Sequence, residues 1–238
     1  MALTRLRSTG MTVALLHPLP LDGSVWSEET RTLVPDTLAP TLYDFGDSIE
    51  SWASGVLDAV ASGPLVVVGN SIGGSCAIEV ARLAPERVRL IVLVGAKAGH
   101  RPEPEFRDEA LRVLETDGMT GAWPRYWAPL FARTADPQLV ERARNLAFDQ
   151  PIDAIIRGVR VFHSRPDRSD FVTRLEVPVL IVRGRHDRII RNGAASAAGL
   201  RHGRVEVVEG AGHYVPLERP AHLAAILRQA IDELASFP

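Results

Sequence analysis

The sequence predicts an α/β fold, with a mostly parallel central sheet, helices on both faces and a short helical lid insertion. Two observations support this prediction. Short, almost wholly apolar runs such as 64–69 and 90–95 alternate with segments of helical spacing, which is typical of parallel strands buried on both faces. Residues 100–170 interrupt this alternation because they contain no clear buried strand. We therefore expect one core domain, 1–99 and 171–238, with a helical cap at 100–170.

Each expected element has a local reason. The strands are short runs of apolar and β-branched residues, expected at 11–18, 41–46, 64–69, 90–95, 177–184 and 204–210. The core helices repeat apolar residues every three or four positions, and they are expected at 28–38, 48–62, 73–88 and about 218–234. Pro35 should shorten or kink the first helix, and the third should end within 73–88, with Pro85 just beyond its last residue. The insertion, rich in arginine, proline and aromatic residues, is expected to form three or four short helices.

The composition is that of an ordinary globular protein. Hydrophobic residues make up 46% and charged residues 24% of the 238 residues, with a net charge of −2 and both signs interspersed. The lack of a basic stripe or polybasic run argues against nucleic-acid and membrane partners. Cys76 is the single cysteine, which excludes an internal disulfide and a cysteine-rich zinc site. Residues 1–18 lack a signal-peptide pattern and no apolar run approaches about 20 residues, so we expect a cytoplasmic protein.

Residues 69–73, Gly-Asn-Ser-Ile-Gly, fit the pattern G-x-S-x-G between a predicted strand and a predicted helix. In that context the serine stands on a tight, strained turn, and the residues two positions away must be small, as Gly69 and Gly73 are. The turn would raise the Ser71 hydroxyl above the carboxyl ends of the strands, where open α/β sheets bind ligands. Alternatively, the glycines only permit close packing of strand and helix. We interpret Ser71 as a candidate nucleophile.

A serine nucleophile needs a base and an orienting carboxylate, and in this architecture the chain order is serine, acid, histidine. Asp187 follows the strand 177–184, and His213 follows the strand 204–210, so both fall at the sheet edge predicted for Ser71. Taken alone, Asp187 could be a surface carboxylate paired with a neighbouring arginine, and His213 an ordinary loop histidine. Their coincidence at one edge favours a catalytic triad of Ser71, Asp187 and His213.

With these motifs the sequence resembles small Ser-Asp-His members of the α/β-hydrolase fold superfamily over nearly its whole length. The similar segments are the elbow "GNSIGG", the acid loop "GRHD", the histidine loop "GAGHYVPLERP" and "HPLPLDGSVW" at 17–26. The resemblance implies that the backbone N–H groups of Leu19 and Ile72 form an oxyanion hole. Pro18 stands where the family commonly has glycine, and proline fixes φ and removes one donor. The inferred donor is Leu19, so the hole can survive this departure.

The expected activity is hydrolysis of an ester or lactone of a small to medium acyl substrate through an acyl-enzyme. The resemblance is strongest to 3-oxoadipate enol-lactonases, small carboxylesterases and meta-cleavage carbon–carbon hydrolases. The partner would be a small-molecule carbonyl substrate, and no metal or organic cofactor is expected. Three alternatives stay open: a carbon–carbon hydrolase, a cofactor-free oxygenase or perhydrolase of the same fold, and a ligand-binding module that kept the triad.

Substrate choice is expected to lie in the insertion. Trp123, Trp127 and Phe131 recur at i, i+4 and i+8, and this apolar stripe either lines the pocket or packs the lid onto the core. Phe162 and Ile189 are further pocket candidates. A lactonase could use a cation for a substrate carboxylate, although helix-surface arginine is the commoner explanation. The candidates among the arginines of the insertion are Arg125, Arg133, Arg160 and Arg165.

Overall fold

The computed structural model describes residues 10–190 and 199–234. Within them, six parallel strands form one sheet in the order β2-β1-β3-β4-β5-β6. The strands are β1 (Thr12–Leu16), β2 (Thr37–Leu38), β3 (Leu65–Asn70), β4 (Val88–Val94), β5 (Val179–Gly184) and β6 (Gly203–Val208). The parallel sheet is as predicted. The first nine residues of the segment assessed for a signal peptide lie outside the described residues.

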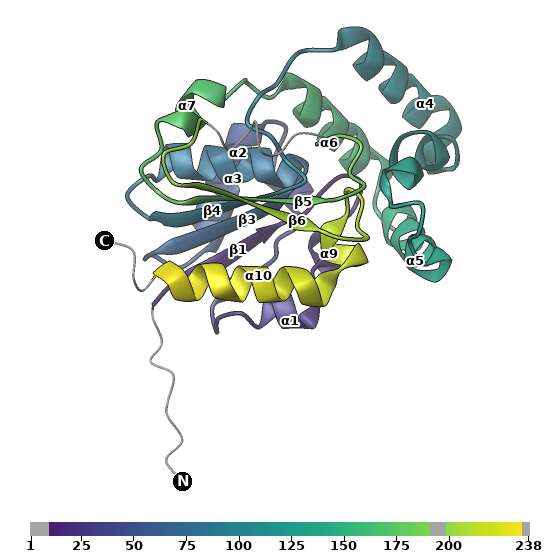
Figure 1. The fold of residues 1–238 in the computed structure, drawn as a ribbon. Coiled ribbons are helices and arrows are strands. Elements are labelled where there is room, and N and C mark those ends of the chain that lie inside the picture. Colours follow the sequence, from purple (N-terminus) through teal and green to yellow (C-terminus); the bar gives the residue numbers. More distant parts are fainter. Residues whose placement is uncertain (1–9, 191–198, 235–238) are drawn as a thin grey trace.

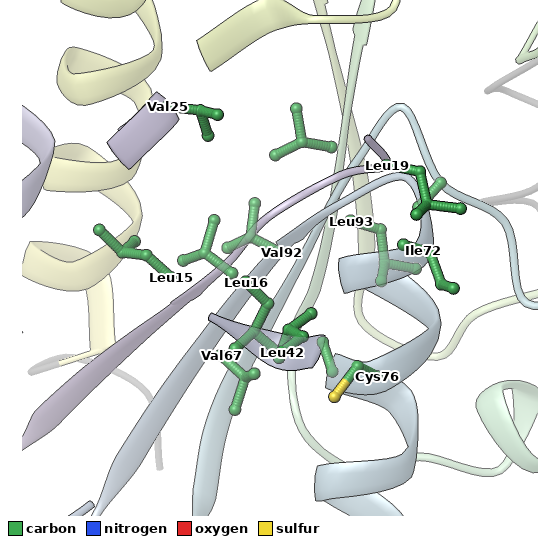
Figure 2. Close-up of a cluster of buried hydrophobic side chains, with 14 of the residues drawn as sticks. Leu15, Leu16, Leu19, Val25, Leu42, Val67, Ile72, Cys76, Val92 and Leu93 are labelled. Atoms are coloured by element: carbon green, nitrogen blue, oxygen red, sulfur yellow. The ribbon is translucent and has the colours of Figure 1, made fainter. Parts of the chain in front are cut away.

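Helices cover both faces of this sheet, as expected. Figure 1 shows α2 (Ile49–Ala59) and α3 (Ile72–Leu83) over one face, and α1 (Glu28–Arg31) and α10 (Pro220–Glu233) over the other. A short helix, α9 (Val215–Glu218), precedes α10. Because both faces are covered, the middle of β3 is fully buried, which explains its unbroken apolar run. Cys76 lies within the packed side chains on the α3 side and is fully buried (Figure 2).

Two predictions for the second and third elements were wrong. Residues 41–46 are not a strand, because η2 (Leu42–Phe45) is a 3-10 turn in which the N–H of Leu42 donates to Nε2 of the buried His17 at 2.8 Å. The predicted helix 28–38 ends at Arg31, and its last two residues form the edge strand β2. Pro35 explains this end, since proline cannot donate within a helix and it drives the preceding residue out of the α region.

The chain between β4 and β5 is helical, as predicted. It comprises α4 (Pro104–Ala122), a π turn η3 (Trp123–Trp127), a 3-10 turn η4 (Ala128–Leu130), α5 (Pro137–Phe148), α6 (Ile152–Ser164) and α7 (Ser169–Thr173). Figure 1 shows α4, α5 and α6 grouped together beyond one end of the sheet. Gly118 interrupts α4 with a φ of 61°. No helix within residues 10–190 and 199–234 combines the length and the apolar character that a membrane crossing needs.

Candidate active site

Ser71 sits on the sharp turn that joins β3 to α3. Its φ of 55° and ψ of −119° make it the one non-glycine residue with positive φ in the described part of the chain. A side chain at Gly69 would collide with the carbonyl group of Gly73, and one at Gly73 with the carbonyl group of Leu16. Both glycines are therefore required for the turn, as the sequence predicts. A strained backbone of this kind is typical of functional sites and costs about 1–3 kcal/mol.

Asp187 and His213 form a buried, hydrogen-bonded pair. The His213 Nδ1 atom lies 3.0 Å from Oδ2 of Asp187. The other carboxylate oxygen accepts the backbone N–H groups of Ile189 and Ile190 at 2.7 and 3.0 Å. Burial alone would raise the pKa of Asp187, but these hydrogen bonds and the nearby His213 hold it below its ordinary value. The carboxylate is thus ionised at neutral pH and orients the imidazole ring.

Ser71 and His213 line one cavity, and Asp187 contacts His213, so the three triad candidates lie together at one edge of the sheet. Since Nδ1 of His213 faces Asp187, Nε2 is the ring nitrogen left for a proton transfer. Within residues 10–190 and 199–234 no hydrogen bond joins the Ser71 hydroxyl to His213. Such bonds are often long in free enzymes and tighten when the substrate binds.

Asn70 and Glu218 hold the backbone of the His213 loop by hydrogen bonds, and neither residue was predicted from the sequence. Nδ2 of the buried Asn70 donates to the backbone carbonyl of His213 at 3.2 Å. The buried Glu218 carboxylate accepts the N–H groups of Gly212 and Tyr214 at 3.0 and 3.3 Å. It also accepts the N–H of Ala132 from the helical insertion at 2.9 Å. The signal was available, because Glu218 lies within the quoted segment "GAGHYVPLERP".

The loop after β1 lies directly against the serine turn. The carbonyl groups of Leu16 and His17 are close enough to exclude any side chain at Gly73. Leu19 lines a cavity together with Ser71 and His213. The carbonyl group of Pro18 accepts the N–H of Leu21 at 3.1 Å, so Pro18 begins a turn in which its own missing donor is not required. The two proposed oxyanion donors, Leu19 and Ile72, therefore belong to segments that meet beside Ser71.

Two cavities of different character meet at Ser71. One, of about 160 Å³, is mainly apolar and includes Leu19, Leu114, Trp127 and Val159 in its wall. The other is an open cleft of about 770 Å³ with several basic side chains. The side chains that line both are Ser71, Phe106, Phe162, His163 and Ile189. The two cavities therefore share part of their walls at Ser71.

The predicted pocket residues separate into two groups. Trp127, Phe162 and Ile189 line the cavities at Ser71. Trp123 and Phe131 do not line either cavity; their rings lie 6.2 Å apart, and Phe131 packs 4.7 Å from Tyr214 of the core. The assumed helical stripe does not form because a π turn and a 3-10 turn replace a regular helix over this stretch.

The arginines and histidines of the insertion also differ in position. Arg125 pairs with Glu109, and Arg160 lies 3.7 Å from Glu115, so both belong to the helix surface. Arg165 instead lines the basic cleft beside Ser71, as do His100 and His163. In the described part of the chain, no group of three or more histidine, cysteine or carboxylate side chains is placed to hold a metal ion.

The chain resembles one protein family and several known proteins. A family model described as the alpha/beta hydrolase family matches residues 13–226. A 2-hydroxy-6-oxo-2,4-heptadienoate hydrolase of Pseudomonas putida is 32% identical over 105 residues, which span 37% of this chain and 38% of that protein. A 2-hydroxy-6-oxononadienedioate/2-hydroxy-6-oxononatrienedioate hydrolase of Paraburkholderia xenovorans is 25% identical over 94% of this chain and 86% of its own. The solved structure of a thermophilic esterase from Thermogutta terrifontis superposes with a TM-score of 0.83 at 24% identity, covering 95% of this chain and 91% of that one.

Proposed function

This chain belongs to the alpha/beta hydrolase family, and from that premise we propose that it is a serine hydrolase that cleaves an ester or a lactone. Ser71 is the proposed nucleophile, His213 the base and Asp187 the orienting acid. One observation carries the proposal: His213, hydrogen-bonded to Asp187, lines the same cavity as a serine held on a strained turn. The helices between β4 and β5 are the proposed cap over this site.

The proposed reaction follows from the positions of these groups. Ser71 Oγ attacks the substrate carbonyl carbon while His213 Nε2 takes its proton, and Asp187 stabilises the resulting imidazolium. The N–H groups of Leu19 and Ile72 receive the oxyanion, aided by the positive end of α3. His213 then donates its proton to the leaving group, and a water molecule deprotonated by His213 releases the acyl group. The apolar cavity of about 160 Å³ favours a small to medium substrate.

A carbon–carbon hydrolase is the second candidate. It is favoured by the names of the two curated relatives described above, which are hydrolases of oxo-dienoate compounds. The same serine, histidine and oxyanion groups would serve that reaction, so the geometry of the triad candidates does not separate the two. The bond that is cleaved must be identified with substrates.

Labelling with a fluorophosphonate probe tests the nucleophile. We expect the folded wild-type protein to be labelled and Ser71→Ala to be unlabelled. Ser75→Ala is the matched control, because Ser75 lines the same cleft one turn further along α3. Wild-type protein that stays unlabelled, or labelling that survives in Ser71→Ala, contradicts the proposal.

A substrate panel then separates the two reactions. Short aryl esters, lactones and dienoate ring-fission products are assayed with the wild type and with Ser71→Ala. Hydrolysis of esters or lactones alone supports the first candidate, and faster turnover of the ring-fission products supports the second. Oxygen uptake or peracid formation with poor ester turnover would indicate a non-hydrolytic member of the family instead.

A further inference from the structure

Arg165 is a buried cation in the wall of the cleft that contains Ser71. It follows α6, at the point where that helix ends, and its side chain lines the cleft together with Ser71 and His163. Only 7% of its surface is exposed. A charged side chain is rarely buried to this degree unless an opposite charge accompanies it.

The guanidinium group of Arg165 has no carboxylate partner among the described residues, whose ion pairs involve other arginines and one histidine. Nη1 donates to the backbone carbonyl of Phe162, and the group stacks over the Phe162 ring at 4.0 Å. Within the described part of the chain, these contacts leave Nε and Nη2 without an acceptor. Burial lowers the pKa of Arg165 to about 10, so it remains charged at neutral pH. The Glu103 carboxylate partly opposes this lowering of the pKa of Arg165. It is exposed, however, and it forms no ion pair with Arg165.

The other groups around Arg165 do not compensate for its charge. His100 and His163 share the cleft wall, and Nε2 of His100 lies 3.0 Å from the carbonyl oxygen of His163. Burial and the charge of Arg165 lower the pKa of both, that of His163 to about 4, so His163 is neutral at pH 7. Lys97 and Arg101 add further positive charge at the exposed rim of the cleft. The acidic side chains of the lining, Glu103 and Glu105, are exposed at the same rim.

We propose that Arg165 binds a carboxylate group of the substrate. The apolar cavity and the basic cleft share Ser71 in their walls, so the substrate would be a carbonyl compound that carries both an apolar group and a carboxylate. A guanidinium group with free donors matches a carboxylate in both charge and shape. This inference rests on the proposed function for the identity of the bond that is cleaved, but not for the binding of the anion.

If Arg165 had only a structural role, a different effect of its substitution would be expected. A cation at the C-terminal end of α6 interacts favourably with the helix dipole, and stacking on Phe162 buries apolar surface. In that case, removing the charge would affect neutral and anionic substrates alike. The test therefore compares matched substrates that differ by one carboxylate.

The experiment uses two substrate pairs and three variants. One pair carries the carboxylate on the acyl group, p-nitrophenyl pentanoate and mono-p-nitrophenyl glutarate. The other carries it on the leaving group, phenyl butyrate and 4-butyryloxybenzoate. Arg165→Gln removes the charge, Arg165→Lys keeps it, and Arg160→Gln is the matched control, on α6 and outside the cleft.

We expect the wild type to prefer the carboxylate-bearing member of at least one pair through a lower KM. Arg165→Gln should raise that KM about 10- to 100-fold, as expected for loss of a charged hydrogen bond, with little effect on the neutral ester. Arg165→Lys should recover part of the preference, and Arg160→Gln should behave as wild type. The proposal is overturned if the wild type shows no preference in either pair, or if Arg165→Gln raises the KM of the neutral and the anionic substrate of a pair equally.

Equilibrium binding separates this inference from the proposed function. The anionic substrates are titrated into Ser71→Ala and into Ser71→Ala combined with Arg165→Gln. A 10-fold or greater loss of affinity in the double variant supports the carboxylate site even if the wild type hydrolyses no ester and is not labelled by the fluorophosphonate. Equal affinity in the two proteins rejects the site even if Ser71 is shown to be the nucleophile.

Discussion

The Asp187 carboxylate uses each oxygen for a different task. Oδ2 faces His213 Nδ1, whereas Oδ1 is fixed by the N–H groups of Ile189 and Ile190. Because the backbone contacts hold the carboxylate in place, a substitution can remove its charge without changing its orientation. An amide in the same position would keep the shape of the side chain and lose its charge.

Asp187→Asn should therefore lower kcat by about four powers of ten with only a modest effect on folding, by analogy with the same change in a serine protease triad. The amide NH2 would face Nδ1 and stabilise the wrong tautomer of His213. Steady-state hydrolysis of a neutral aryl ester measures the effect, and Asp58→Asn, at an exposed position of α2, is the control. A loss of less than tenfold in kcat would mean that Asp187 is not the orienting acid.

The triad candidates were predictable because each follows a strand, and the carboxyl ends of parallel strands meet at one edge. From the sequence, Arg165 could be named only as one of four candidate cations among the arginines of the insertion. What distinguishes it is burial without a carboxylate partner, which depends on how the end of α6 lies against the cleft. The contact of Asn70 with His213 and that of Glu218 with Ala132 were missed for a similar reason, since each joins residues that are distant in the sequence.

At the level of elements, Glu218 connects the histidine loop to the insertion. Its carboxylate lies at the end of α9 and accepts N–H groups from Gly212, Tyr214 and Ala132. Burial raises the pKa of Glu218, and the donors only partly oppose this rise. The position of His213 thus depends on a group five residues away from it along the chain.

Glu218→Ala should destabilise the fold by about 2–3 kcal/mol, because it leaves buried N–H groups without an acceptor. It should also lower kcat more than it changes KM, since His213 would lose its fixed position. Glu218→Gln keeps one carbonyl oxygen and should restore part of both losses. Urea unfolding and ester kinetics measure the two effects, with the exposed Glu233→Gln as control. Wild-type kcat in a folded Glu218→Ala protein would argue against this positioning role.

The sequence predicts regular, buried elements better than it predicts irregular ones. The apolar runs of β1, β3, β4 and β5 identify strands because burial on both faces requires such runs. The segment 41–46 has strand-like composition, but the bond from the Leu42 N–H to His17 holds it in a 3-10 turn. That bond joins residues 25 positions apart and leaves no local signal in the sequence.

At the level of the whole molecule, His17 connects the first strand, the loop proposed to supply an oxyanion donor and the turn η2. It is fully buried, and its Nε2 accepts the N–H of Leu42 while Nδ1 lies 3.1 Å from the carbonyl oxygen of Pro18. Burial lowers the pKa of His17 from 6.5 to about 4, and the nearby Asp22 opposes this only in part. Folding therefore requires the neutral imidazole.

The free energy of unfolding should fall as the pH falls from about 6.5 to about 4. In this range the unfolded chain binds a proton at His17 that the folded protein does not, and the pKa values of 6.5 and about 4 correspond to roughly 3 kcal/mol. His163, whose pKa is also lowered to about 4, should contribute in the same direction. Urea unfolding at pH 7 and pH 4.5 measures the change.

His17→Gln places an amide oxygen near the position that Nε2 of His17 occupies in the wild type, where it can still accept the Leu42 N–H. It should be less stable than the wild type at pH 7, because the amide does not fill the space of the ring, but its stability should fall less on acidification. The exposed His222→Gln controls for removal of any histidine. If wild type and His17→Gln lose the same free energy between pH 7 and pH 4.5, the buried imidazole is not the group that couples the fold to pH.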